Sequence, residues 1–268
     1  MPLGTDDKIL TAWNGLMLMA LSRAAWAFRD RRYLNEAREL AAFMAGRLHE
    51  GGRLKARLCR GELRFPAQLD DYAFYALGLL ELYRADFDPG HIAAAKALAF
   101  EILSRFPDEN GGFYRSAGDA EQLFIRPKEV YDGALPSGNS AAALLFASLG
   151  RLCGDVPFME QAQAQLAFLC SACAAVPAGC VFGYLPMMEL VYGGRELVCA
   201  LPDESLPQAM EAVLSRYSPE LLVLKKTPSS AALLAELAPF TSGMEPQAGK
   251  GACYICRDGA CSLPVTEL

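Results

Sequence analysis

Acidic residues recur at the start of each long apolar helix that the sequence predicts. Asp6 and Asp7 precede the first such helix, Asp70 and Asp71 begin the second, and Asp132 comes shortly before the third. Two carboxyl groups roughly 6.5–9.5 Å apart act as acid and base in inverting glycosidases. Neighbouring helices pack about 8–10 Å apart, so carboxylates at adjacent helix starts can meet that spacing. We therefore interpret Asp71 and Asp132 as the candidate catalytic pair.

Helix capping is the alternative role for each of these acidic residues. Asp and Ser are among the commonest N-caps, and each cap contributes about 1 kcal/mol by accepting backbone N–H bonds. Such bonds lower the pKa of a carboxyl group, which suits a base or a nucleophile but opposes a general acid. Capping therefore stays open beside catalysis.

Further polar and aromatic side chains surround the same helix starts and are candidates for sugar binding. Aromatic rings there can stack on sugars, although aromatic residues in buried helices are also typical of a packed core. The segment 131–140 is rich in small polar residues and can direct backbone N–H groups toward a ligand, or simply form a tight turn into a helix. The candidate substrate-binding residues are Asp7, Trp13, Asn14, Asp70, Tyr72, Ser137 and Asn139.

The cysteines and histidines offer less chemistry. Among nine cysteines, only Cys253, Cys256 and Cys261 are spaced as a cluster, and no fourth local ligand completes a zinc site. Cys256 and Cys261 are a candidate redox pair, with simple packing as the alternative. The two histidines, at positions 49 and 91, lie at the ends of predicted outer helices. We expect no metal site and no histidine-based proton transfer.

Composition narrows the class of protein and of partner. The 268 residues are 53% hydrophobic and 21% charged, which is typical of a packed globular chain, and the net charge is −6. An acidic chain is a poor partner for nucleic acid or for an anionic membrane. No apolar run approaches the roughly 20 residues of a membrane span, and the start does not resemble a signal peptide. We expect a cytoplasmic protein with reduced cysteines and no cofactor, since no phosphate-binding glycine loop is present.

Helical couplets repeat about every sixty residues through the first 175 positions. Each couplet pairs a nearly all-apolar helix, covered on most sides, with an amphipathic one that faces water on one side. Glycine-containing segments at 51–66 and 111–127 separate the couplets, and each is predicted to form a short β-hairpin. Such a repeat indicates an α/α toroid of inner and outer helices. The predicted couplets are 10–28 with 32–48, 69–83 with 91–106, and 140–153 with 158–173.

The pattern changes after residue 180. One more helix is predicted at 184–191, followed by a strand, a helix, a strand and a helix between residues 196 and 237, with a last strand near 254–255. That order indicates a small α/β lobe. The predicted fold is thus mainly α: a partial α/α toroid over residues 1–195 and an α/β lobe with a cysteine-containing tail over 196–268.

Four ordered motifs together resemble the thioredoxin-domain-containing spermatogenesis-associated protein 20 family. The run from Asp6 to Met17 resembles a hallmark of that family. The segments 69–73 and 126–140 and the C-terminal segment from Cys256 to Pro264 match it in the right order. Members of the family look like a thioredoxin-fold domain followed by a six-hairpin toroid, similar to N-acylglucosamine 2-epimerases and unsaturated glucuronyl hydrolases. The resemblance implies that this sequence is the C-terminal part of such a protein, without the thioredoxin-like domain and the first toroid hairpins.

Two functional readings follow from the residues and the resemblance. The first is a carbohydrate-processing protein that binds, hydrolyses or isomerises a sugar in the toroid cavity. The epimerase histidines have no counterpart here, which counts against epimerisation. The second is a non-catalytic binding or scaffold module that works with a thioredoxin-like domain in redox chemistry or protein quality control. An open half-toroid would expose the apolar flank of residues 13–27, so we also expect self-association unless another segment covers that flank.

Overall fold

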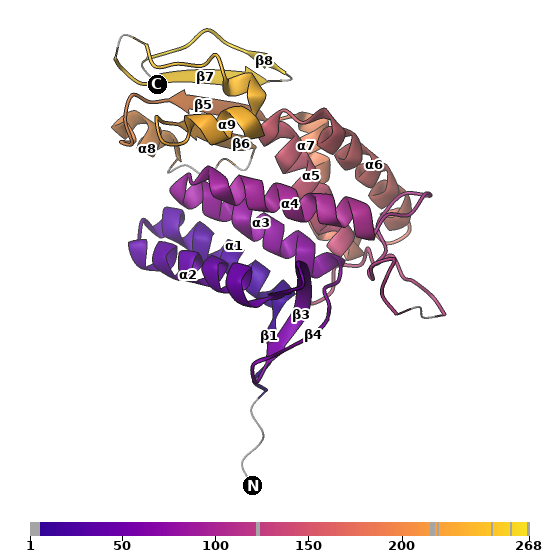
Figure 1. Cartoon of the computed structure of the whole chain (residues 1–268). Coiled ribbons are helices and arrows are strands. Elements are labelled where there is room, and N and C mark those ends of the chain that lie inside the picture. Colours follow the sequence, from indigo (N-terminus) through magenta and orange to yellow (C-terminus); the bar gives the residue numbers. More distant parts are fainter. Residues whose placement is uncertain are drawn as a thin grey trace.

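Three helical hairpins follow one another along the chain in the computed structural model, which describes residues 6–121, 124–214, 218, 220–247, 249–257 and 259–266 (Figure 1). The turns between the paired helices contain the predicted residues Asp30, Asp88 and Asp155. Each of them caps the following outer helix by accepting a hydrogen bond from a backbone N–H. The hairpins pair α1 (Thr11–Phe28) with α2 (Arg31–Arg47), α3 (Leu69–Asp86) with α4 (Pro89–Arg105), and α5 (Gly138–Cys153) with α6 (Val156–Cys173).

The inner helices form a row in which α1 packs on α3, α3 on α5, and α5 on α7 (Tyr184–Tyr192). Two glycines allow α1 and α3 to approach closely. A Cβ atom at Gly15 would lie 2.7 Å from the backbone of Phe74, and one at Gly78 would lie 2.8 Å from the carbonyl oxygen of Gly15. The row of inner helices with outer partners confirms the predicted partial toroid.

A small antiparallel sheet stands beside the start of α3. In it, β3 (Arg53–Cys59) pairs with β4 (Glu62–Pro66) across a two-residue turn, and also with β1 (Ile9–Leu10) and β2 (His49–Glu50). The first predicted hairpin is therefore present.

The second predicted hairpin, over 111–127, is absent among the described residues, where Phe113 makes only an isolated bridge to Pro107. The amide group of Asn139 takes its place: Oδ1 accepts from the N–H of Phe113, and Nδ2 donates to the carbonyl oxygen of Phe113. Those backbone groups are no longer free to pair with a strand.

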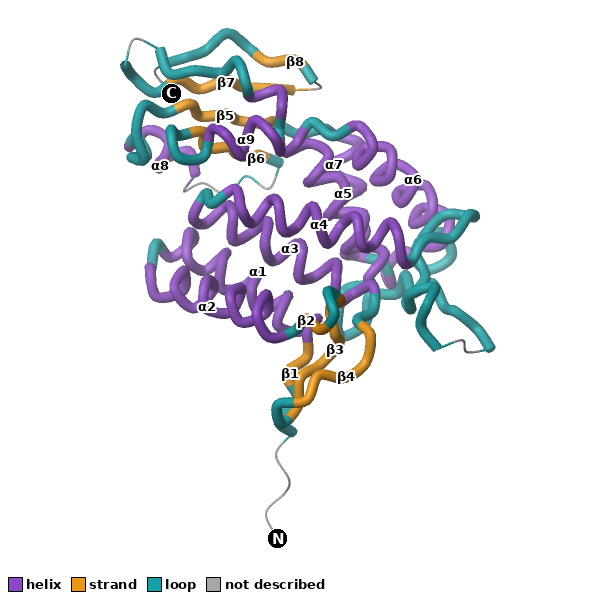
Figure 2. Tube along the Cα trace, in the orientation of Figure 1, coloured by secondary structure: helices purple, strands orange, loops and turns teal. Residues whose placement is uncertain are grey.

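The α/β lobe follows the order predicted from the sequence. Its sheet runs β6–β5–β7–β8, with β5 parallel to β6 and antiparallel to β7. Figure 2 shows the lobe and the β1–β3–β4 sheet on opposite sides of the helices. Its elements are β5 (Arg195–Ala200), α8 (Gln208–Leu214), β6 (Leu221–Lys226), α9 (Ala231–Leu237), β7 (Ala252–Arg257) and β8 (Ala260–Cys261).

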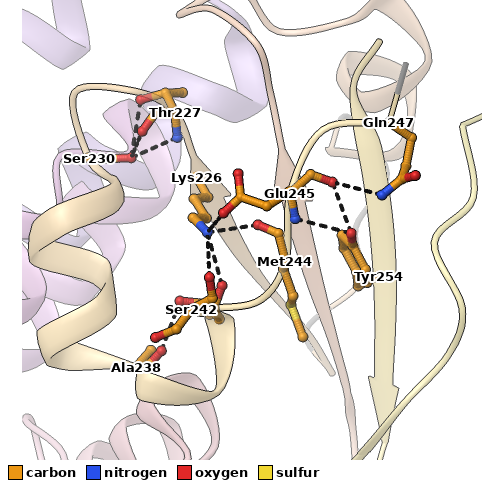
Figure 3. Close-up of polar contacts among 10 residues, drawn as sticks. Lys226, Thr227, Ser230, Ala238, Ser242, Met244, Glu245, Gln247 and Tyr254 are labelled. Atoms are coloured by element: carbon orange, nitrogen blue, oxygen red, sulfur yellow. Dashed lines mark hydrogen bonds and ion pairs between the residues drawn. The ribbon is translucent and has the colours of Figure 1, made fainter. Parts of the chain in front are cut away.

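A buried lysine at the end of β6 organises the loop after α9 (Figure 3). The ammonium group of Lys226 donates to the carbonyl oxygens of Thr241, Ser242 and Met244 at 2.7–3.2 Å. It also forms an ion pair with Glu245 at 2.8 Å. The charge is thus fully hydrogen-bonded, which a buried ammonium requires.

Arg151, near the end of α5, joins the helical row to the lobe. Its side chain is 7% exposed and forms ion pairs with Glu189 of α7 at 3.4 Å and Glu196 of β5 at 2.8 Å. It also donates to the carbonyl oxygen of Glu220 at 2.8 Å. One face of the lobe sheet contributes to the same apolar core as the helices. The division at residue 195 stays a prediction. Within the described residues, no helix combines the length and apolarity that crossing a membrane requires.

Candidate functional site

A pocket of about 230 Å³ lies where α3 and α5 begin. Leu69 and Asp70 of α3 form one side, Arg115 and Glu129 contribute from the connecting loops, and Tyr131 with residues 133–139 forms the other side. The starts of two neighbouring inner helices therefore meet at one end of the row, as the sequence predicts. Helix starts direct unpaired N–H groups and partial positive charge toward such a space.

Asp71 is buried beside this pocket and both of its carboxylate oxygens are occupied. Oδ2 accepts from the N–H of Gln68, which completes a capping box at the start of α3. Oδ1 accepts from the N–H of Ala12 in the first turn of α1. Burial, followed by the nearby charge of Asp70, raises the pKa of Asp71 to about 7 against the opposing effect of these two donors. Asp71 thus links two inner helices.

Asp132 has a comparable role at the start of α5. Its Oδ1 accepts from the N–H of Ser137 at 2.7 Å, and its Oδ2 accepts from the N–H of Phe182 at 2.6 Å. Neither Asp71 nor Asp132 lines the pocket. Both oxygens of each carboxylate accept hydrogen bonds from backbone N–H groups. The geometry therefore favours the capping alternative for Asp71 and Asp132, and their acid/base role stays a prediction.

Asp70 and Glu129 are carboxyl groups in the pocket lining, and Asp70 is the more buried of the two. Its Oδ1 is buried and has no hydrogen-bond partner among the described residues. Burial raises the pKa of Asp70, the guanidinium of Arg115 opposes the rise, and the carboxylate of Glu129 adds to it. A partly desolvated carboxyl group with one unpartnered oxygen in a pocket wall is an arrangement typical of proton donors.

Arg115 and Glu129 are functional candidates that the sequence reasoning missed. Arg115 donates through Nε to the side chain of Gln68 at 2.7 Å and lies 3.4 Å from the carboxylate of Glu129. Both residues lie in connecting loops without helical periodicity. The sequence offers one hint of a functional role for them, which is that both lie in the segment that connects α4 to α5.

Ser137 and Asn139 line the pocket, but most of their polar groups support the loop. Ser137 caps α5 by accepting from the N–H of Ser140. Asn139 is fully buried and donates to the carbonyl oxygens of Phe113 and Glu129. These two predicted binding residues therefore shape the pocket wall and fix the loop that carries Glu129.

The other predicted binding residues lie away from the pocket. Tyr72 is 3% exposed and packs edge-on against Phe106 in the core, which matches the packing alternative. Asp7 forms an exposed ion pair with Arg60 at 2.9 Å. Asn14 donates to the carbonyl oxygen of the residue four positions earlier. Trp13 is 61% exposed on the outer flank of α1.

Cys256 and Cys261 form a disulfide that links β7 to β8. Cys256 is buried and Cys261 is exposed. Cys173 and Cys180 form a second disulfide, while Cys199 and Cys253 are buried free thiols 3.6 Å apart. Four of the nine cysteines are thus in disulfides and the other five are free thiols, so most are reduced, as expected from the sequence. Among the described residues, no group of three metal-ligating side chains is present.

Sequence comparison confirms the resemblance read from the four motifs. The chain is 28% identical over 282 residues to spermatogenesis-associated protein 20 of Rattus norvegicus and 27% identical to the Homo sapiens protein. Each alignment covers 98% of this chain and 35% of the relative. The chain thus spans about a third of the length of the curated relatives it matches. No family model matches the chain.

Solved structures with the same fold confirm the α/α toroid. Cellobiose 2-epimerase from Spirochaeta thermophila aligns with a TM-score of 0.56 and 14% identity, covering 91% of this chain and 64% of that structure. The GH76 α-mannanase from Bacteroides thetaiotaomicron aligns with a TM-score of 0.55 and 16% identity, covering 71% and 55%. At these identities the likeness concerns the fold.

Proposed function

We propose that the pocket at the starts of α3 and α5 binds a carbohydrate and that Asp70 donates a proton to it. One observation carries the proposal: Asp70 places a buried, unpartnered carboxyl oxygen in the pocket wall. Burial raises the pKa of Asp70, so the group holds its proton to higher pH than a free aspartate. A general acid requires that property.

Glu129 supplies the second carboxyl group and acts as the base. In glycoside chemistry one carboxylic acid protonates the departing oxygen while a carboxylate activates water or attacks the sugar. The carboxylate of Glu129 lines the pocket and lies 3.4 Å from the guanidinium of Arg115. The two acidic groups thus differ in their contacts: Asp70 has one buried oxygen without a hydrogen-bond partner among the described residues, and Glu129 forms an ion pair with Arg115.

Tyr131 provides a stacking surface for the sugar ring. Its side chain is 63% exposed and lines the pocket. The ring packs against Gly179, where an added Cβ would lie 2.8 Å from a ring carbon. A ring supported from behind and open in front can stack on the apolar face of a sugar. The likeness of the fold to an epimerase and an α-mannanase supports carbohydrate as the ligand class by analogy.

Calorimetric titration with neutral and uronic sugars tests the proposal. Asp70→Asn keeps the shape but removes the acid, so we expect turnover of a bound sugar to fall at least about 100-fold with binding retained. Asp88→Asn, which changes an exposed cap of α4, is the matched control and should leave turnover unchanged. A folded protein that binds none of the sugars would contradict the proposal.

The disulfide of β7 and β8 supports a second candidate function, thiol exchange with a thioredoxin-fold partner. A partner thiolate that attacks the exposed Cys261 sulfur would form a mixed disulfide and release the Cys256 thiolate. A thioredoxin with its second active-site cysteine replaced should trap that mixed disulfide. Mass spectrometry that finds no adduct on Cys261 would exclude this exchange.

A further inference from the structure

A second and larger pocket lies at the other end of the inner helices. It has a volume of about 370 Å³ and opens between the final turns of α1 and α3 and the lobe elements α8 and β6. Its size falls within the roughly 300–1,000 Å³ typical of small-molecule sites, which often form where two structural units meet. Asp70 and Arg84 are separated by fourteen positions on α3, or about 20 Å of helix, so this pocket is independent of the first.

Apolar side chains from both parts of the molecule line the pocket. Leu34 comes from α2, Phe87 from the end of α3, and Leu214 and Val223 from the lobe. Trp26 of α1 adds an indole ring, whose N–H is buried without an acceptor among the described residues. Such a lining favours the hydrocarbon part of a ligand by about 0.8 kcal/mol for each buried methylene.

Three arginines stand around this apolar space. Arg29 and Arg31 are exposed, and neither forms an ion pair within the part of the chain that the structure describes. Arg84 lies over the ring of Trp26, 5.8 Å from its centre, and its guanidinium is 3.9 Å from Glu81. Arg29 and Arg31 therefore lie beside the apolar lining without an acidic partner among the described residues.

Two acidic residues also line the pocket, and they do not cancel this charge. Asp30 is already occupied by Arg32, which donates to its Oδ2 through Nη2 at 2.6 Å and through Nε at 3.0 Å. Hydrogen bonds from Arg32 lower the pKa of Asp30. Glu211 of α8 remains as the one further carboxylate in the lining. The balance around the pocket is positive.

We propose that this pocket binds an amphipathic anion, namely a hydrocarbon chain that ends in a single carboxylate. The chain lies against the leucines, Phe87 and Trp26, and the carboxylate pairs with Arg29 and Arg31 at the rim. Arginine suits this role because its planar guanidinium can bind both carboxylate oxygens. Charge complementarity and apolar lining together set this ligand apart from a neutral sugar.

Tryptophan fluorescence can follow binding at this pocket alone. The chain has two tryptophans, so a Trp13→Phe background leaves Trp26 as the reporter. Decanoate is the probe, used below its micellar concentration, with decanol and decyltrimethylammonium as neutral and cationic controls. We expect decanoate to bind at least about tenfold more tightly than decanol, and the cation to bind least.

Two variants locate the binding. Arg29→Gln with Arg31→Gln should weaken decanoate at least about tenfold and leave decanol unchanged. The control, Arg47→Gln with Arg64→Gln, removes the same charge from surface positions outside the pocket and should change nothing. Ala85→Leu, which adds no fluorophore, should fill part of the pocket and weaken the binding of both decanoate and decanol, with circular dichroism to verify folding. Equal affinity for decanoate and decanol, or decanoate binding unaffected by the first variant, would overturn the proposal.

Discussion

Two inner helices of equal length, α1 and α3, differ in what surrounds them. Each has 18 residues, but α3 buries fourteen of them and α1 buries seven. The helix α3 has an inner neighbour on both sides, whereas α1 has one, α3 itself. The side of α1 away from α3 carries a stripe of apolar residues at helical spacing: Trp13, Met17, Ala20, Ala24 and Ala27. The same kind of sequence therefore yields a core or a surface, depending on the neighbour.

A matched pair of truncations should give the largest contrast between these helices. Phe74→Ala removes a fully buried ring from α3 and should cost about 3–5 kcal/mol of unfolding free energy. Phe28→Ala removes a ring that is 71% exposed at the end of α1 and should cost less than about 0.5 kcal/mol. Urea denaturation measures both. Similar losses would show that α1 is covered in solution.

The next contrast concerns the hydrogen bonds that hold α1 to α3. Asp71→Ala leaves the N–H groups of Ala12 and Gln68 without acceptors, and we expect a loss of about 2–3 kcal/mol in the same urea experiment. Asp88→Ala, which removes an exposed cap of α4, should cost about 1 kcal/mol. Equal losses would mean that Asp71 acts only as a local cap.

The pH dependence of stability should reveal the burial of Asp71. Its folded-state pKa is raised to about 7, above the unfolded value near 4, so the folded state binds more protons in between. Stability from this group is therefore greatest below about pH 4 and falls as the pH rises through 7, by on the order of 4 kcal/mol. Asp71→Asn should flatten that part of the curve. Parallel curves for the two proteins would contradict this assignment.

Substitutions on the exposed flank of α1 should have the smallest effect on stability but a clear effect on self-association. We propose that the exposed flank of α1 causes self-association, so Trp13→Glu with Met17→Lys should shift the protein toward monomer at micromolar concentration. Val156→Ser, which changes an exposed apolar residue at the start of α6, is the control. Light scattering that finds a clean monomer of the unchanged protein would refute the idea.

Helical periodicity was sufficient to predict the framework. Each part of the framework has a local signal in the sequence. The number of apolar faces distinguishes inner from outer helices, Asp marks the start of the outer helices, and the change of hydrophobic period after residue 180 marks the α/β lobe. The hairpin predicted over 111–127 does not form among the described residues, where the N–H and C=O of Phe113 bond to the side chain of Asn139 in the next helix. The local sequence pattern of a segment cannot predict that a side chain from another element will bind its backbone N–H and C=O groups.

The sequence predicted where the candidate site lies, at the starts of the inner helices, but not which carboxyl groups line it. Asp70 and Asp71 are consecutive, so their side chains point about 100° apart around α3. The capping box with Gln68 occupies one oxygen of Asp71, and the packing of α1 against α3 brings the N–H of Ala12 to the other, while Asp70 lines the pocket. Arg115 and Glu129 lie in loops, where no period relates a residue to its partners.

The bond from Asp71 to Ala12 has a consequence for amide exchange. A backbone N–H in the first turn of a helix has no acceptor within that helix and normally exchanges quickly with solvent deuterium. The N–H of Ala12 instead donates to a buried carboxylate 59 positions along the chain. It should exchange only when α1 separates from α3, so this single amide would report the opening of the helical row.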